Sequence, residues 1–145
     1  MRRGFDTIKA YWVITNLIYN IMAKYVDGFV FVVAKKNLAA YRKMAQGGRK
    51  LWMKYGALDY KECMLNDPKP EYITFTFPKM VKQKKGETVW FSYIVYKSRK
   101  HRDEVNAKVM KDPAMNDPKW KDKPMPFDMK RMALGGFNVI VDSKG

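Results

Sequence analysis

Two segments of this chain are apolar on both sides, and they restrict its fold more than any other feature. Residues 25–33 read Tyr-Val-Asp-Gly-Phe-Val-Phe-Val-Val, and residues 88–96 read Thr-Val-Trp-Phe-Ser-Tyr-Ile-Val-Tyr. β-Branched and aromatic residues favour strands, and a strand that is apolar on both faces belongs in the interior of a sheet. We therefore predict two central strands.

Two helices are predicted beside these strands. Asn37 is a suitable N-cap for a helix over residues 37–55, and Gly56 provides the left-handed position that ends it. Ser98 is a suitable N-cap for a second helix that continues to Lys111. The other predicted segments are an edge strand at 57–65, a short extended piece at 72–77, a charged turn at 82–86, a loop with one helical turn at 113–126 and a last strand at 134–141.

The order of these elements indicates the fold class. Strand, helix, strand, strand, helix, strand is a duplicated β-α-β unit, the βαββαβ arrangement of ferredoxin-like α+β subunits with an antiparallel sheet. A chain of 145 residues has room for one such core, so we expect a single domain over residues 22–145. Helices on one face would leave the other face of the central strands uncovered. We expect a second copy to cover that face, which would make the protein a homodimer.

Residues 1–21 have a different character, and three interpretations are open. A basic start followed by a mostly apolar run at 10–23 resembles a secretion signal, but Asn16 interrupts the run and no small-residue cleavage site follows it. A membrane span needs about 20 continuous apolar residues, more than this run supplies. The third interpretation, which we prefer, is an amphipathic or disordered extension outside the domain, with the natural start at Met22. We accordingly expect a cytoplasmic protein without a membrane segment.

The scarcity of cysteine and histidine excludes several kinds of site. Cys63 is the single cysteine, which excludes an intrachain disulfide and a cysteine-cluster zinc site. His101 is the single histidine, which excludes metal motifs built from paired histidines. We therefore expect neither a bound metal nor a cofactor.

The chain resembles a known family over about residues 22–142. The resemblance is carried by the block Ser-Arg-Lys-His-Arg-Asp-Glu-Val-Asn-Ala-Lys-Val-Met-Lys-Asp-Pro at 98–113 and by Met-Pro-Phe-Asp at 125–128. Shorter supporting stretches lie at 25–29, 35–45, 56–63 and 86–97. Together they resemble the small bacterial YbaA-like family, a group of unknown function. The resemblance implies a ferredoxin-like subunit of the dimeric α/β-barrel superfamily.

That superfamily includes cofactor-independent monooxygenases that act on aromatic polyketides, haem-degrading enzymes and proteins without known activity. Because such activities differ between proteins of one fold, the resemblance implies no particular reaction.

The candidate site residues are mostly aromatic. His101 lies in the first turn of the helix predicted after Ser98, and its imidazole is the one catalytic candidate, with local packing or capping as the alternative. Asp27 lies within a buried strand, where a carboxylate needs a partner such as an arginine. The residues that could line a small aromatic pocket between sheet and helix, as an alternative to plain core packing, are Phe29, Phe31, Trp52, Phe91, Tyr93 and His101.

The basic character of the chain gives a second functional hypothesis. The formal net charge is +15 at pH 7, and lysines gather at 79–85 and, around Trp120, at 119–123. Such clusters can bind phosphate backbones or single-stranded bases, but the motifs of the common nucleic-acid-binding domains are missing. We therefore place first a protein that binds a small aromatic or apolar molecule, and second one that binds nucleic acid or an acidic partner.

Overall fold

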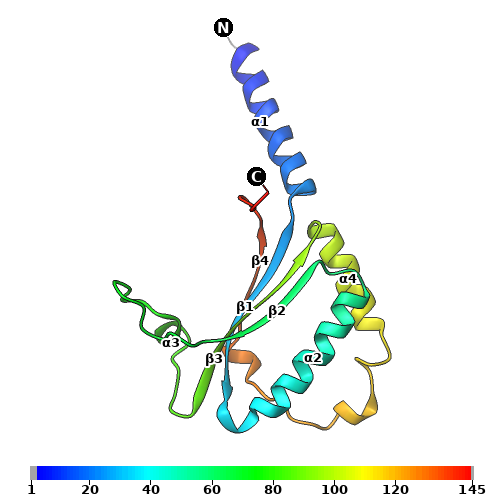
Figure 1. Cartoon of the computed structure of the whole chain (residues 1–145). Helices are drawn as coiled ribbons and strands as arrows, with labels where there is room; N and C mark the ends of the chain where they lie inside the picture. The colour runs from blue at the N-terminus through cyan, green and yellow to red at the C-terminus, as the bar shows by residue number, and fades with distance from the viewer. Residues whose placement is uncertain (1–2, 145) are drawn as a thin grey trace.

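The two central strands predicted from the sequence lie in the middle of a four-stranded antiparallel sheet (Figure 1). The computed structural model describes residues 3–144. The central strands are β1 (Tyr25–Ala34) and β3 (Glu87–Tyr96), and the edge strands are β2 (Asp59–Met64) and β4 (Ala133–Asn138). Their order β2-β3-β1-β4 is that of a ferredoxin-like sheet, so the predicted α+β fold is confirmed.

The helices lie in the connections between the strands. They are α1 (Arg3–Met22), α2 (Leu38–Lys54), the four-residue α3 (Phe77–Met80) and α4 (Arg99–Lys111), with single 3-10 turns at η1 (Lys35–Asn37), η2 (Pro118–Trp120) and η3 (Met129–Arg131). Helices α2 and α4 pack on the same face of the sheet. The crossover from β1 to β2 therefore runs through α2, and the one from β3 to β4 through α4.

The ends of these helices test three sequence predictions. The Ser98 hydroxyl accepts a hydrogen bond from the His101 backbone N–H at 3.1 Å, so the N-cap of α4 is confirmed. Gly56 follows α2 with a φ of 109°, the left-handed conformation predicted for it. Asn37 occupies the N-cap position of α2 as predicted, but its side chain makes no capping hydrogen bond, because the chain enters α2 through η1 and the side-chain amide donates to the Pro126 carbonyl.

The face of the sheet that carries α2 and α4 holds the core. Side chains alternate along a strand, and directly paired residues of neighbouring strands share a face. Phe31 pairs with Trp90, and both are packed with Tyr41 of α2. Tyr25 pairs with Tyr96, and both belong to a second cluster that includes Val105 of α4. The odd positions of β1 and the even positions of β3 therefore face the helices.

The opposite face, called here the open face, is apolar and carries no helix of the described chain except the short α3 at its margin. Phe91 and Phe137 are 44% and 59% exposed on it. The Phe137 ring lies over Gly28 and Gly135, because neither glycine has a Cβ to block it. The residues that the pairing register places on this face are Val26, Gly28, Val30 and Val32 of β1, Val89, Phe91, Tyr93 and Val95 of β3, Asp59, Lys61 and Cys63 of β2, and Ala133, Gly135 and Phe137 of β4.

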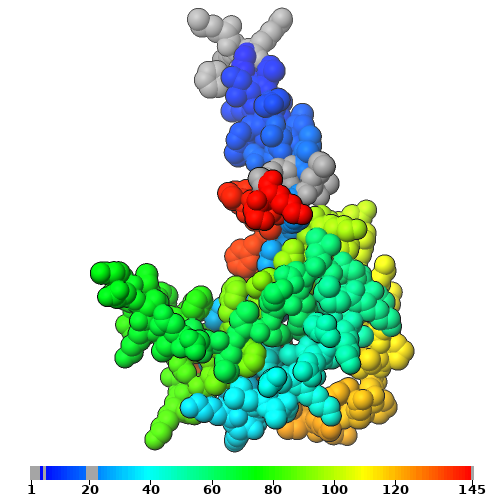
Figure 2. All heavy atoms as spheres, viewed as in Figure 1, coloured from blue at the N-terminus to red at the C-terminus, as the bar shows by residue number. Residues whose placement is uncertain are grey.

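Two segments differ from their predicted structure. The extended piece predicted at 72–77 is wrong: this stretch belongs to an arm, residues 66–80, that stands out from the sheet and has no strand to pair with (Figure 2). Tyr72 at its tip has a φ of 65° and is 95% exposed. The last strand ends at Asn138 rather than at 141, because its pairing partner β1 begins at Tyr25, opposite Asn138.

The segment that precedes the domain is helical. Helix α1 runs directly into β1 and projects beyond the sheet (Figure 1), with exposed apolar side chains that include Tyr11, Trp12 and Leu17. The extension was expected to be either amphipathic or disordered, and in the structure residues 3–22 form a helix. No helix in the described part of the chain is both long enough and apolar enough to cross a membrane.

Candidate functional site

A small cavity lies between α2 and the part of the sheet formed by β2 and β3. Its volume is about 200 Å³, and it is open to solvent on one side. The residues that line it are Arg42, Ala45, Gln46 and Arg49 of α2, Tyr60 and Glu62 of β2, and Trp90 of β3. The cavity therefore combines an aromatic wall, one carboxylate and two guanidinium groups.

The Glu62 carboxylate is held by three hydroxyl groups from three different elements. Its Oε1 accepts a hydrogen bond from the Tyr60 hydroxyl at 2.8 Å, and its Oε2 accepts one from the Tyr41 hydroxyl at 2.6 Å. The Ser92 hydroxyl also donates to Oε2. Tyr41 and Ser92 are 3% and 5% exposed, so this carboxylate is fixed on the side that faces the core.

Strand alternation is what assembles this cluster. Tyr60 and Glu62 are two residues apart on β2 and point to the same face, where Glu62 lies directly opposite Ser92 of β3. Tyr41 reaches the same carboxylate from the first turns of α2. A one-residue shift of β2 would turn Glu62 to the open face and dismantle the cluster.

The two tyrosines remain donors throughout the ordinary pH range. Burial raises the pKa of the Tyr41 phenol above its usual value, and the hydrogen bond to Glu62 raises it further. Burial likewise raises the pKa of Tyr60, with the negative charge of Glu62 as the next cause. Neither phenol can therefore serve as a phenolate near neutral pH, and both remain hydrogen-bond donors to Glu62.

Gly48 makes room for one of these hydroxyls. A Cβ at Gly48 would lie 2.8 Å from the Tyr60 hydroxyl oxygen, closer than a carbon atom can approach without displacing it. Glycine usually weakens a helix interior, so its presence in the middle of α2 has a specific local reason. The neighbouring Gly47 has no atom within 4 Å of the same position and provides a natural comparison.

Arg42 and Arg49 give the cavity a positive margin. They lie seven residues apart on α2, two helical turns, with Gln46 between them on the same side. No ion pair between described residues involves either arginine, and the Glu62 carboxylate accepts its hydrogen bonds from hydroxyls instead. Both guanidinium groups are therefore available to an anion in the cavity.

The structure does not bring the six residues chosen from the sequence around one cavity. Phe31 and Trp52 lie on the helix side of the sheet in two different core clusters, and Phe29 packs against both clusters. Phe91 and Tyr93 lie on the open face, with ring centroids 5.9 Å apart. The aromatic residues therefore divide between the two sides of the sheet.

His101 lies away from the cavity, at the start of α4. Its Nδ1 accepts a hydrogen bond from the Lys97 backbone N–H at 3.0 Å, and its ring meets the edge of Tyr96 at a centroid distance of 6.2 Å. A Cβ at Gly56 would lie 3.3 Å from its Nε2. These contacts correspond to the local packing that the sequence left open as the alternative to catalysis.

The partner expected for Asp27 is present. Asp27 is 4% exposed, and its carboxylate accepts a hydrogen bond from Arg102 of α4 at 2.6 Å. Burial raises the pKa of Asp27, against the opposing effect of the arginine. The Arg102 guanidinium also lies 4.9 Å from the centre of the Tyr25 ring. The prediction of an arginine partner is confirmed.

The sequence patterns used above do not predict the residues that line the cavity, although the alternation on β2 points to two of them. Alternation on β2 places Tyr60, Glu62 and Met64 on one side, and a glutamate on the mostly apolar side of a strand requires buried donors. The contributions of Tyr41 and Ser92 depend on tertiary contacts that no local pattern reveals.

Comparison with known proteins shows the family to which the chain belongs. A model of the family described as "Protein of unknown function (DUF1428)" matches residues 24–129. The chain belongs to this family. It is 43% identical over 119 residues to proteins named "Uncharacterized protein YbaA" from Escherichia coli strain K12, Escherichia coli O157:H7 and Shigella flexneri, and the match covers 82% of this chain and 98% of each relative. The resemblance to YbaA-like proteins is therefore confirmed.

Proposed function

We propose that this protein binds a small aromatic molecule that carries an anionic group, in the cavity between α2 and the sheet. The observation that carries the proposal is the combination of a fixed carboxylate, Glu62, with two unpaired arginines, Arg42 and Arg49, around one hollow. Ligand sites are typically apolar clefts with a few polar groups that fix orientation. The cavity has both parts, since Trp90 and Tyr60 supply the aromatic wall.

The cavity is widely open to solvent and has room for about one ring. An engineered cavity of about 150 Å³ holds benzene, so about 200 Å³ fits one substituted ring. Arg42 and Arg49 would pair with its anionic substituent. The Oε1 of Glu62 has one hydroxyl partner, Tyr60, and would accept a second hydrogen bond from a hydroxyl of the ligand. The proposal therefore gives the polar role to these residues of β2 and α2, and none to His101.

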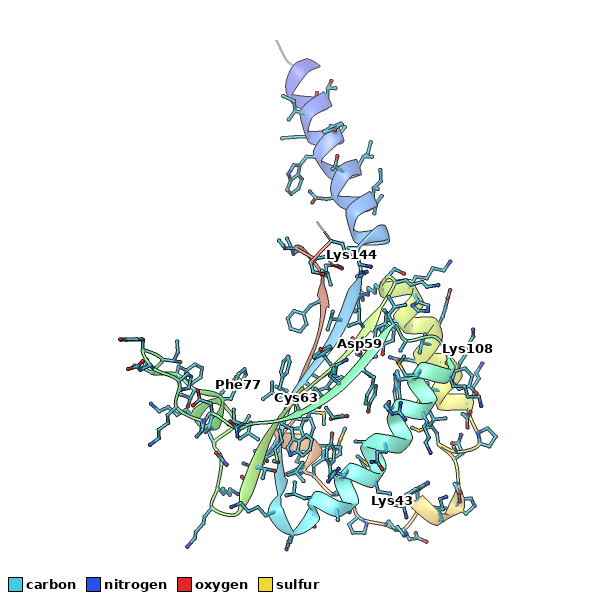
Figure 3. All side chains as sticks on the ribbon, viewed as in Figure 1. Lys43, Asp59, Cys63, Phe77, Lys108 and Lys144 are labelled. Carbon is cyan, nitrogen blue, oxygen red and sulfur yellow. The ribbon has the colours of Figure 1, made fainter. Side chains whose placement is uncertain are left out.

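The test is binding of simple ring compounds by calorimetry. We expect salicylate, which has both a carboxylate and a hydroxyl, to bind more tightly than benzoate, and benzoate more tightly than phenol. The variant R42Q/R49Q should weaken salicylate binding by about tenfold, equivalent to about 1.4 kcal/mol. The control K43Q/K50Q removes the same charge from α2 at exposed lysines that do not line the cavity; Figure 3 labels Lys43.

The results that would overturn this proposal are specific. Equal loss of binding in R42Q/R49Q and K43Q/K50Q would mean that only the net charge of the helix matters. Salicylate, benzoate and phenol that all fail to bind at millimolar concentration would leave the cavity without the proposed ligand class.

We also propose that the protein is a homodimer in which the open faces of two sheets pack on each other. The open face is continuous with the arm, because Phe77 of α3 packs against Phe91 with ring centroids 6.4 Å apart. Figure 3 labels Phe77 at the base of the arm and Cys63 on the neighbouring strand β2. The arm adds further exposed apolar side chains at Tyr72, Ile73 and Phe75. An apolar surface of this kind is unusual on a monomer, and a second copy is the partner with an equally large apolar face.

Sedimentation equilibrium tests the dimer. We expect twice the chain mass at micromolar concentration for the natural sequence and a single chain mass for F91D/F137D, which places two charges on the open face. M110D is the matched control, since Met110 is an exposed apolar residue of α4 on the other side of the sheet. A single chain mass for the natural sequence would overturn the proposal, as would a dimer that F91D/F137D leaves intact.

A further inference from the structure

A second hollow, separate from the cavity beside α2, lies between the turn before β3 and the turn before β4. Its volume is about 500 Å³, and it is broadly open to solvent. The residues that line it are Met80, Val81, Lys82 and Lys84 from the first segment and Lys130, Arg131, Met132 and Ala133 from the second. Segments 46 or more residues apart in the sequence thus contribute four cationic side chains to one hollow.

The hollow is framed by Arg131 and Glu87. The Arg131 guanidinium bonds to both oxygens of the Glu87 carboxylate, and its Nη2 also donates to the carbonyls of Val81 and Lys82 at 3.2 and 3.1 Å. Lys82 has a φ of 51°, a left-handed conformation that is uncommon outside glycine, and this contact secures its carbonyl. One arginine therefore ties the two turns together and fixes the shape of the hollow.

The nearby carboxylate, Glu87, is bonded to Arg131, and the charge of Lys84 acts on it only from beyond ion-pair distance. Both oxygens of Glu87 are engaged by Arg131, and the backbone N–H of Lys84 donates to Oε2 at 2.7 Å. No ion pair between residues of the described chain involves Lys82, Lys84 or Lys130. Like charges gathered around a concave surface raise the local positive potential, which is relieved by an anion.

We propose that this hollow binds a small molecule that carries a phosphate group on an apolar body. The available cations are lysine ammonium groups, which act as point charges and suit a phosphate with nearly two negative charges better than a planar carboxylate with one. The fork of Arg131, which would suit a carboxylate, is already bonded to Glu87. Met80 and Met132 supply apolar contact for the body of the ligand.

The second lysine cluster of the sequence offers no comparable site. The ammonium groups of Lys119 and Lys123 lie over the Trp120 ring, 5.2 and 5.4 Å from its centre. Both lysines therefore already form cation–π contacts within the chain. Lys119 is also paired with Asp117 at 3.2 Å. The observations therefore favour the hollow at 80–84 and 130–133 as the anion site.

Calorimetric titration of the full chain with phenyl phosphate, inorganic phosphate and benzoate tests the proposal. We expect phenyl phosphate to bind most tightly, and its affinity to fall as the salt concentration rises. The variant K82Q/K84Q/K130Q should weaken phenyl phosphate binding by about tenfold or more, equivalent to about 1.4 kcal/mol. The control K100Q/K108Q/K111Q removes the same charge from exposed lysines of α4, of which Figure 3 labels Lys108.

Three outcomes would overturn the proposal. One is an equal loss of affinity in the hollow variant and the α4 control, which would reduce the effect to net charge. Another is that benzoate binds as tightly as phenyl phosphate and that the variant R42Q/R49Q loses this affinity. That outcome would support a ligand site in the cavity beside α2 alone. The third is failure to bind phenyl phosphate together with tight binding of oligothymidylates that strengthens with length, which would indicate a nucleic-acid surface.

Discussion

Two carboxylates lie on the helix-covered face of one sheet, and the fold stabilises them in opposite ways. Asp27 of β1 lies under α4 and is paired with a full positive charge, the Arg102 guanidinium. Glu62 of β2 lies against α2 and receives three hydroxyl hydrogen bonds, while the nearest helix presents Arg42 and Arg49 at the margin of the cavity instead. Both acids belong to the first β-α-β unit, but Asp27 is neutralised by an arginine from the helix of the second unit, whereas Glu62 forms no ion pair with any described residue.

This difference in partners indicates that Asp27 has a structural role, whereas Glu62 is available to a ligand. A buried ion pair is satisfied internally and has little left to offer a ligand, which fits the 4% exposure of Asp27. Glu62 is held by hydroxyl groups, and the arginines beside it belong to no ion pair of the described residues, so these side chains can still bind a ligand. The comparison therefore predicts that changes around Asp27 alter stability, whereas changes around Glu62 alter stability less and binding more.

The largest effect is expected from breaking the Asp27 pair. R102Q leaves the Asp27 carboxylate buried without its cation, which should lower the free energy of unfolding by roughly 3 kcal/mol. R99Q, at an exposed arginine in the same turn of α4, should change it by less than about 0.5 kcal/mol. Urea unfolding measures both variants. A cost for R102Q no greater than that of R99Q would remove the structural role assigned to the pair.

The next effect concerns the space that Gly48 provides for Tyr60. G48A places a methyl group 2.8 Å from the Tyr60 hydroxyl, so overpacking should lower the free energy of unfolding by about 1–2 kcal/mol even after the gain in helix propensity. G47A meets open space and should raise it by about 0.5–1 kcal/mol. Thermal and urea unfolding of the two variants should therefore shift in opposite directions, and a stabilised G48A would contradict the packing described around Glu62.

A smaller effect is expected from removing one hydroxyl. Y60F deletes a single donor to Glu62 and leaves the bonds from Tyr41 and Ser92, so it should cost about 1 kcal/mol in unfolding free energy. Under the proposed function, Y60F should also change salicylate affinity, because Tyr60 lines the cavity. The exposed Y72F in the arm is the matched control, with no expected effect on either measurement.

The sequence predicts the strands better than the site for a physical reason. The β1 and β3 segments are recognisable because β-branched and aromatic residues dominate them, so local preference and tertiary environment agree. The arm differs, because Tyr72 and Phe75 have strand-forming side chains but project where no neighbouring backbone is available to pair with. The Glu62 cluster depends on a strand register that brings in Ser92, 30 positions away, and on a helix contact that brings in Tyr41, 21 positions away, and no local pattern contains that information.

The smallest effects are pH-dependent, and they should have opposite signs at two aspartates. Hydrogen bonds from Tyr55, from the Ala114 backbone N–H and from Lys54 lower the pKa of Asp112 to about 2 from 3.8. Its contribution to stability is therefore complete above the unfolded pKa and is lost as the pH falls from about 4 towards about 2. D112N should accordingly lose more stability, relative to the natural sequence, at pH 5 than at pH 2.5.

Asp27 should show the reverse slope, because burial raises its pKa above 3.8 in the folded state. The folded protein then binds this proton more tightly than the unfolded chain does, so the contribution of Asp27 to stability declines as the pH rises through the interval just above 3.8. The melting temperature of D27N should thus approach that of the natural sequence as the pH rises. In the same pH range, the melting temperature of D112N should fall further below that of the natural sequence. Parallel pH profiles for the two variants would mean that the charge of Arg102 affects the pKa of Asp27 more than burial does. The expected contrast in pH dependence between Asp27 and Asp112 would then be lost.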